Sequence, residues 1–122
     1  MKFLLDANFL MVPGKFRVDV FRELEKFGSA ELYAPDLVVK ELSRLSKGKG
    51  SDAFSAKLGL SFIQEKDVGI IESQEKTADR ELARLAAEGY TVCTQDKALA
   101  QKILRKGFRV VFLRQGKYLE MK

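Results

Sequence analysis

Five short apolar runs, rich in residues that favour strands, are spread along the chain. They occupy residues 2–5, 31–34, 68–71, 91–93 and 109–113. Runs of this kind, separated by longer segments of a different period, are typical of β-strands. The pattern therefore predicts five strands.

Between these runs, apolar residues recur at helical spacing. Pro35 and Asp36 are good residues for the start of the second predicted helix, Ser51 is expected to cap the third, and Gly89 and Gly107 close the last two. The five stripes are Val20, Leu24 and Phe27; Val38, Leu42 and Leu45; Phe54, Leu58 and Phe62; Ala78, Leu82, Leu85 and Ala86; and Leu99, Ala100, Ile103 and Leu104.

The segment after the first strand is the least regular part of the chain. Pro13 and Gly14 predict a turn over residues 11–16. Elsewhere, strands alternate with helices, which implies right-handed crossovers and a parallel sheet covered on both faces. The prediction is a three-layer α/β/α sandwich in a single domain, residues 1–122, with no linker or repeat.

Charge is distributed unevenly along the sequence. Lysine and arginine outnumber aspartate and glutamate by 22 to 17, and residues 97–122 hold eight basic residues against one acidic residue, Glu120. Such an imbalance favours a polyanionic partner through counterion release, although a basic segment can also serve solubility alone.

Cysteine and histidine content narrows the chemistry further. One cysteine, Cys93, excludes an internal disulfide, the first residues do not resemble a signal peptide, and no apolar run is long enough to cross a bilayer. These features predict a soluble protein of the reducing cytoplasm. Without histidine, any catalysis must use carboxylates, lysine, hydroxyls, the thiol or hard metal ions.

Two aspartates directly follow predicted strands. Asp6 ends the first run, and Asp96 follows the fourth run in T-V-C-T-Q-D-K-A-L. In a parallel α/β sheet, ligands gather at the carboxyl ends of the strands, which makes both residues candidates for a site. Helix capping is the alternative for each of them, and a turn role is the alternative for Asn8, the only asparagine.

Two further carboxylates occupy unusual positions on predicted helices. Glu41 lies in the middle of the apolar stripe formed by Leu37, Val38, Leu42 and Leu45. An isolated charge there would cost several kcal/mol, so Glu41 must pair with a basic residue, bind a cation or face a cleft at the rim of the stripe. Asp79 lies in a first helical turn, where the helix dipole alone would favour an acid. The remaining acidic side chains are expected on solvated faces.

Four carboxylates at one edge of a sheet would repel one another unless cations were present. Oxygen-only ligation suits Mg²⁺ or Mn²⁺ rather than zinc. With a basic surface nearby and no histidine, the best-matched reaction is phosphodiester hydrolysis, in which one ion makes hydroxide from water and another stabilises the leaving 3′ oxygen.

Four motifs in order resemble those of a PIN domain. They are L-L-D-A-N at the amino terminus, V-V-K-E-L, T-A-D-R-E-L-A and T-Q-D-K-A-L, and the resemblance continues through the closing G-F-R-V-V-F-L-R-Q-G-K-Y. The sequence is most similar to small archaeal PIN proteins related to endonucleases that process ribosomal RNA. This resemblance implies a five-stranded parallel sheet of order 3-2-1-4-5, with an acidic site where strands 1 and 4 lie side by side.

The resemblance also implies roles for individual residues. Asp6, Glu41, Asp79 and Asp96 match the catalytic and metal-binding acids. Asn8 and Thr94 match the polar residues that orient a ligand carboxylate or a bound water, so that loss of the Asn8 amide should weaken metal binding or cleavage more than the fold. Many relatives carry another acid directly after the third one, whereas this chain has Arg80, which puts a second metal ion and full activity in question.

The functional prediction is a Mg²⁺- or Mn²⁺-dependent endoribonuclease, with one or two ions, acting in RNA processing. A ribonuclease toxin paired with an antitoxin and a non-catalytic scaffold that binds RNA or protein are the alternatives. A homodimer through the apolar faces of the first and third helices is a further expectation, although Phe54, Leu58 and Phe62 suit a core equally well. The candidates for RNA contact are Arg44, Lys47, Lys49, Lys97, Lys102, Arg105, Arg109 and Arg114.

Overall fold

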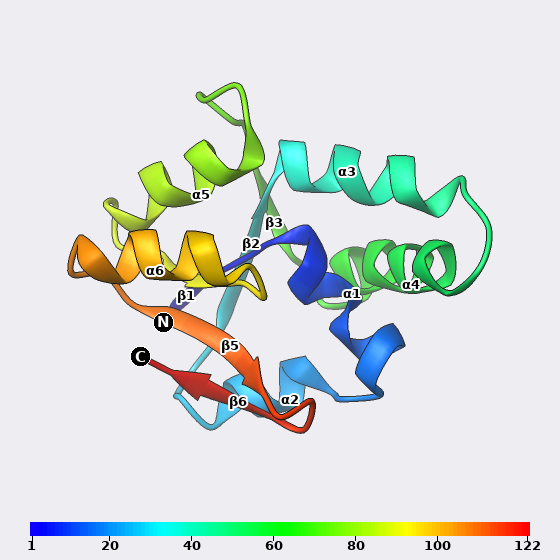
Figure 1. Ribbon diagram of the computed structural model, residues 1–122, viewed down its shortest axis with the longest axis horizontal. Coiled ribbons are helices and arrows are strands. Elements are labelled where there is room, and N and C mark those ends of the chain that lie inside the picture. The colour runs from blue at the N-terminus through cyan, green and yellow to red at the C-terminus, as the bar shows by residue number, and fades with distance from the viewer.

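A six-stranded sheet forms the centre of the structure, a computed structural model that describes residues 1–122 (Figure 1). Its strand order is β3-β2-β1-β4-β5-β6. The first five strands pair in parallel, and β6 pairs with β5 in the antiparallel direction. The strands are β1 (Lys2–Leu5), β2 (Glu31–Pro35), β3 (Gly69–Ile71), β4 (Thr91–Cys93), β5 (Val110–Arg114) and β6 (Tyr118–Met121).

Helices cover both faces of this sheet. On one face α5 and α6 pack over Leu4 of β1 and Val92 of β4, and on the other face the remaining helices pack over Phe3 and Leu5. This alternation along β1 places buried side chains on both sides, as a central parallel strand requires. The helices are α1 (Ala7–Phe16), α2 (Val20–Glu25), α3 (Asp36–Ser46), α4 (Ser51–Glu65), α5 (Ala78–Ala86) and α6 (Lys97–Arg105). None of them is both long enough and apolar enough to cross a bilayer.

The three-layer α/β/α prediction is confirmed, with one strand more than the five predicted. The additional strand, β6, follows Gln115 and Gly116, which both have positive φ. Two successive positive-φ residues form the tight turn that suits a two-stranded hairpin. The Lys117 N–H closes this turn on the Arg114 carbonyl at 3.0 Å, and the chain returns along β5.

The predicted turn over residues 11–16 is wrong, because α1 runs through Pro13 and Gly14 to Phe16. Gly14 packs against α4 so closely that a Cβ on it would lie 2.6 Å from the Ser55 Oγ and 2.9 Å from the Ser55 Cα. The glycine therefore serves helix packing, and the contact between α1 and α4 outweighs the poor helix propensity of both residues.

The predicted apolar face of α4 is also wrong in part. Phe54 is 61% exposed, and the face that meets α1 consists of small residues, including Ala53, Ala56 and Gly59. Small residues let the two helix backbones approach closely, as the Gly14 contact shows. Leu58 and Phe62 remain half-buried. The α4 helix does begin at Ser51, but Gly50 rather than Ser51 occupies its N-cap position.

Gly14→Ala is expected to destabilise the protein by about 1–3 kcal/mol, because the added methyl group overlaps Ser55 and forces the two helices apart. This sign is opposite to the gain of roughly 1 kcal/mol expected for glycine to alanine in an exposed helix. Urea unfolding measures the difference. Gly48→Ala is the control, since a Cβ there meets nothing closer than 3.4 Å. Equal stability of the two variants would refute the close packing of α1 on α4.

Candidate active site

A cavity of about 460 Å³ opens where β1 and β4 end. All four predicted acids line it, and each comes from a different place in the fold: Asp6 follows β1, Glu41 lies on α3, Asp79 on α5, and Asp96 precedes α6. Asn8 lines the same cavity. We call it the acidic cavity. The two central strands lead into helices on opposite sides of the sheet here, which is where α/β folds place their ligands.

Asp6 is the most buried of the four acids, with 6% of its surface exposed. One carboxylate oxygen accepts the Phe9 N–H at 2.7 Å and thereby caps α1, and the other accepts the Thr94 hydroxyl. Burial is the main reason that the pKa of Asp6 rises from 3.8 to about 6; Asp96 and Asp79 add to the rise, and the two hydrogen bonds oppose it. Two hydrogen bonds therefore hold the Asp6 carboxylate in place, but they do not offset the cost of burying its negative charge.

Thr94 connects two of the acids. Its hydroxyl donates to Asp6 and accepts the Asp96 N–H at 3.0 Å, and its side chain is buried. Asp96 is the N-cap of α6, and its Oδ1 accepts the Ala98 and Leu99 N–H groups at 2.9 and 3.1 Å. Asp6 and Asp96 are thus helix caps, as the capping alternative predicted, and each also lies in the acidic cavity.

Glu41 lies at the edge of the apolar stripe of α3 and faces the acidic cavity. Its side chain is 43% exposed. Both oxygens accept hydrogen bonds from Arg44, at 2.8 Å from Nη2 and 3.3 Å from Nε. The sequence left three alternatives for Glu41, and two of them are correct at once: Glu41 pairs with a basic residue, and it also faces a cleft. Arg44 lines the same cavity.

Asp79 and Asn8 also line the acidic cavity, and they come from helices on opposite faces of the sheet. Asp79 lies in the first turn of α5, and Asn8 lies in the first turn of α1. Both are exposed, and neither side chain takes part in a hydrogen bond in the structure. They are therefore free to turn toward a ligand in the acidic cavity.

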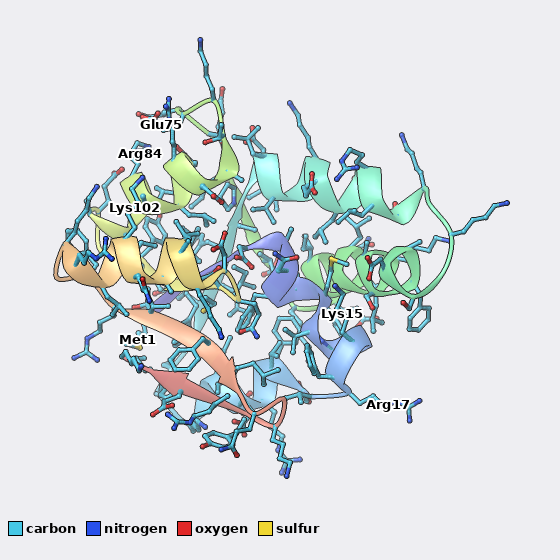
Figure 2. The ribbon with its side chains drawn as sticks, in the orientation of Figure 1. Met1, Lys15, Arg17, Glu75, Arg84 and Lys102 are labelled. Atoms are coloured by element: carbon cyan, nitrogen blue, oxygen red, sulfur yellow. The ribbon has the colours of Figure 1, made fainter.

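Glu81 was expected on a solvated face, and that expectation is wrong: the residue is fully buried. Its carboxylate accepts the Gln74 and Glu75 N–H groups at 3.2 Å and pairs with Arg84 at 2.7 Å, so the pKa of Glu81 lies below its usual range. Arg84 lies on α5 beside Glu75 of the preceding loop (Figure 2). Glu81 thus ties this loop to α5 two residues after Asp79. Its helical spacing from the buried Leu85 and the half-buried Ala78 could have indicated its burial.

The eight candidates for RNA contact are all exposed, as Figure 2 shows for Lys102 on α6. Only Arg44 lines the acidic cavity. Two others have partners at the C-terminal hairpin: Arg114 pairs with Glu120 at 2.7 Å, and Arg109 contacts the Met121 sulfur at 3.1 Å.

A comparison with protein families adds independent information. The model of the family described as "PIN like domain" matches residues 3–116. The chain belongs to this family. The resemblance seen in the sequence motifs is therefore confirmed.

Two curated proteins are similar to this PIN-like domain over most of its length. Ribonuclease VapC4 of Methanocaldococcus jannaschii is 28% identical, and the match covers 98% of this chain and 95% of the relative. Ribonuclease VapC9 of Archaeoglobus fulgidus is also 28% identical, with 93% and 84% covered.

Two solved structures share the fold. The structure described as that of the PIN domain endonuclease Utp24 aligns with a TM-score of 0.77 at 18% identity, covering 99% of this chain and 90% of that one. A domain of a functionally unknown protein from M. jannaschii aligns with a TM-score of 0.65 at 17% identity, covering 93% and 91%.

The donor set of this PIN-like domain fits a hard divalent cation by its chemistry. All four acids of the cavity offer oxygen atoms, and a cation would offset the charge of the buried Asp6. As the side chains stand, no group of three acidic residues is arranged to hold a metal ion. The Glu41 carboxylate faces the cavity while it is paired with Arg44.

Proposed function

We propose that this PIN-like domain is a metal-dependent endoribonuclease that hydrolyses RNA phosphodiester bonds. The observation that carries the proposal is the meeting of four carboxylates from separate elements in one cavity at the ends of β1 and β4. The two curated relatives are both named ribonucleases, which supports RNA as the substrate. The cofactor would be Mg²⁺ or Mn²⁺, held by Asp6, Glu41, Asp79 and Asp96.

The chain's own residues have distinct tasks in this proposal. Thr94 and the Phe9 N–H hold Asp6 in a fixed orientation, and Asp96 keeps Oδ2 free of hydrogen bonds. When bound, the ion supplies hydroxide from water and charge for the leaving oxygen. Glu41 would hold the ion in place of Arg44, and the Arg44 guanidinium would then be available to bind a phosphate of the RNA.

The proposed role is RNA processing, because the motifs and the closing segment resemble those of RNA-processing PIN proteins. A toxin with an antitoxin partner would use the same residues and the same chemistry, so it is the second candidate. Expression of the chain alone in a host cell separates the two roles: growth arrest that depends on Asp96 supports the toxin, and unimpaired growth supports RNA processing.

Cleavage of a mixed RNA substrate tests the proposed activity. We expect Mn²⁺ to support cleavage, EDTA to stop it, and Asp96→Asn to abolish it. Glu65→Gln on α4 is the control, since Glu65 is exposed and lies outside the acidic cavity. Cleavage that persists in EDTA or in Asp96→Asn would refute the metal-nuclease proposal. RNA binding without any cleavage would favour the scaffold, an outcome consistent with Arg80 in place of an acid.

Thr94→Val is expected to lower cleavage about 10- to 100-fold, which is the usual effect of removing a residue that orients a metal ligand. The valine keeps the shape of threonine but can neither donate to Asp6 nor accept the Asp96 N–H. The measurement is the Mn²⁺ concentration that gives half-maximal cleavage, which should rise. Thr91→Val is the matched control, because Thr91 is also buried, at the start of β4, which Thr94 directly follows, but its side chain forms no hydrogen bond with Asp6. An equal effect of the two variants would refute the orienting role.

A further inference from the structure

A second cavity of about 260 Å³ lies between α6 and β5, next to the acidic cavity. Asp96 lines both cavities, so they adjoin at the start of α6. Figure 1 shows α6 running alongside β5, the strand next to the edge strand β6. The Gln95 side chain accepts the Leu113 N–H at 2.7 Å and fixes the loop between β4 and α6 to β5. The second cavity is therefore bounded by fixed elements.

The floor of this cavity is apolar, and its rim is polar and basic. Ala100 and Leu104 of α6 face Val110 and Phe112 of β5 across the floor, and the rim carries Lys97, Gln101 and Lys122. Asp96 is the only acidic residue in the lining. A floor of this kind with cations above it suits a flat apolar ring system attached to a negative group.

Phe112 supplies an aromatic surface that α6 does not fully cover. Val110, two residues earlier on the same face of β5, is fully buried, whereas Phe112 is half-buried. The Lys122 Nζ lies over the Phe112 ring, 5.3 Å from its centre, on a flexible side chain that a stacked base would displace to the side of the ring. An aromatic face with a cation beside it is how proteins commonly bind the bases of single-stranded nucleic acid.

We propose that the second cavity binds one unpaired nucleobase of the RNA strand, stacked on Phe112, next to the phosphate that is cleaved. The position of that phosphate rests on the proposed nuclease function, whereas the binding of the base does not. Lys97 directly follows Asp96, so its cation suits the phosphate between the stacked base and the acidic cavity. Gln101 offers an amide for the polar edge of the base.

Size and charge favour a nucleobase over an apolar peptide side chain. A volume of about 260 Å³, against about 30 Å³ for one water molecule in the liquid, admits a base but not a folded duplex. An apolar peptide would gain contact with the floor but would leave the lysines of the rim without an anion. The eight basic residues among residues 97–122 extend this positive character beyond the cavity.

The test is a double-mutant cycle between the protein and the RNA. Binding of short fluorescent single-stranded RNAs is measured by anisotropy in EDTA, so that cleavage does not interfere. Each RNA carries one abasic nucleotide at a different position. For the wild-type chain, one abasic position should weaken binding about tenfold. Phe112→Leu should weaken binding of the intact RNA by a similar factor and should then show no further loss with that abasic RNA.

Two additional variants keep the test decisive. Gln101→Ala on the exposed side of α6 should weaken binding about threefold without affecting folding, as judged by its melting temperature. Phe54→Leu is the matched control, because it makes the same chemical change at an exposed position of α4. It should have no effect on RNA binding.

Each outcome bears on the proposal separately from the nuclease function. Coupling between Phe112 and one abasic position supports the base-binding cavity even if no RNA is cleaved. Active cleavage with equal binding by wild type and Phe112→Leu, or an equal loss at every abasic position, overturns it. Absence of any RNA binding overturns it as well, and a peptide would then be the occupant to test.

Discussion

Asp6→Asn is expected to lower RNA cleavage by a factor on the order of a thousand. The substitution removes the one carboxylate that is buried at the base of the acidic cavity, and transition-state stabilisation by a bound ion is worth several kcal/mol. Asparagine keeps an oxygen that can accept the Phe9 N–H, so α1 should retain its cap. The loss should therefore appear in the rate of cleavage and not in the folding of the protein.

Asp19→Asn is the matched control for this variant. Asp19 also caps a helix, accepting the Arg22 N–H at 3.1 Å at the start of α2, but it is exposed and lies outside the acidic cavity. Single-turnover cleavage in Mn²⁺ compares the two variants at equal protein concentration. A similar rate for Asp6→Asn and Asp19→Asn would show that Asp6 acts only as a cap.

Asp6→Asn is also expected to stabilise the metal-free protein at neutral pH, by up to about 3 kcal/mol. The pKa of Asp6 is about 6 in the folded chain, against an ordinary value of 3.8. The folded state therefore binds the proton more tightly than the unfolded state. Below about pH 4 the carboxyl is protonated in both states and costs nothing, whereas above about pH 6 it is ionised in both, and its burial lowers the free energy of unfolding.

Urea unfolding in EDTA at several pH values measures this effect. The stability contributed by protonated Asp6 should be lost as the pH rises from about 4 to 6, so the variant and wild type should differ little at pH 4 and most at pH 7.5. Mn²⁺ at pH 7.5 should raise the stability of wild type and reduce its deficit against Asp6→Asn. A constant difference across the pH range would contradict the raised pKa.

The sequence predicted the layers because the strands are short, apolar and separated by clear helical stripes, whereas the strand order was implied by the resemblance to PIN domains. It failed where packing between helices overrides local preference. Pro13 and Gly14 have poor helix propensity, yet α1 continues through them because Gly14 fits against Ser55 of α4. Phe54 lies on an apolar stripe but is exposed, since the neighbouring helix needs small residues at the contact. Neither contact has a local signature.

The site was predictable to the extent that it depends on topology. Asp6 and Asp96 follow adjacent parallel strands, so the strand order alone brings them together. Side-chain partners were harder to predict. The pairing of Glu41 with Arg44 was only one of several alternatives. The buried Glu81 carboxylate accepts the Gln74 and Glu75 N–H groups, and these partners belong to a loop whose path the sequence does not indicate.

Calorimetric titration of Mn²⁺ into the EDTA-treated and dialysed protein at pH 7.5 measures whether the acidic cavity holds a metal ion, on which the proposed nuclease chemistry depends. We predict that the wild-type chain binds Mn²⁺ and that Asp6→Asn and Asp96→Asn each weaken binding at least about 100-fold, whereas Asp19→Asn binds as wild type does. No binding to the wild-type chain, or equal binding by all four proteins, would show that the acidic cavity is not a metal site.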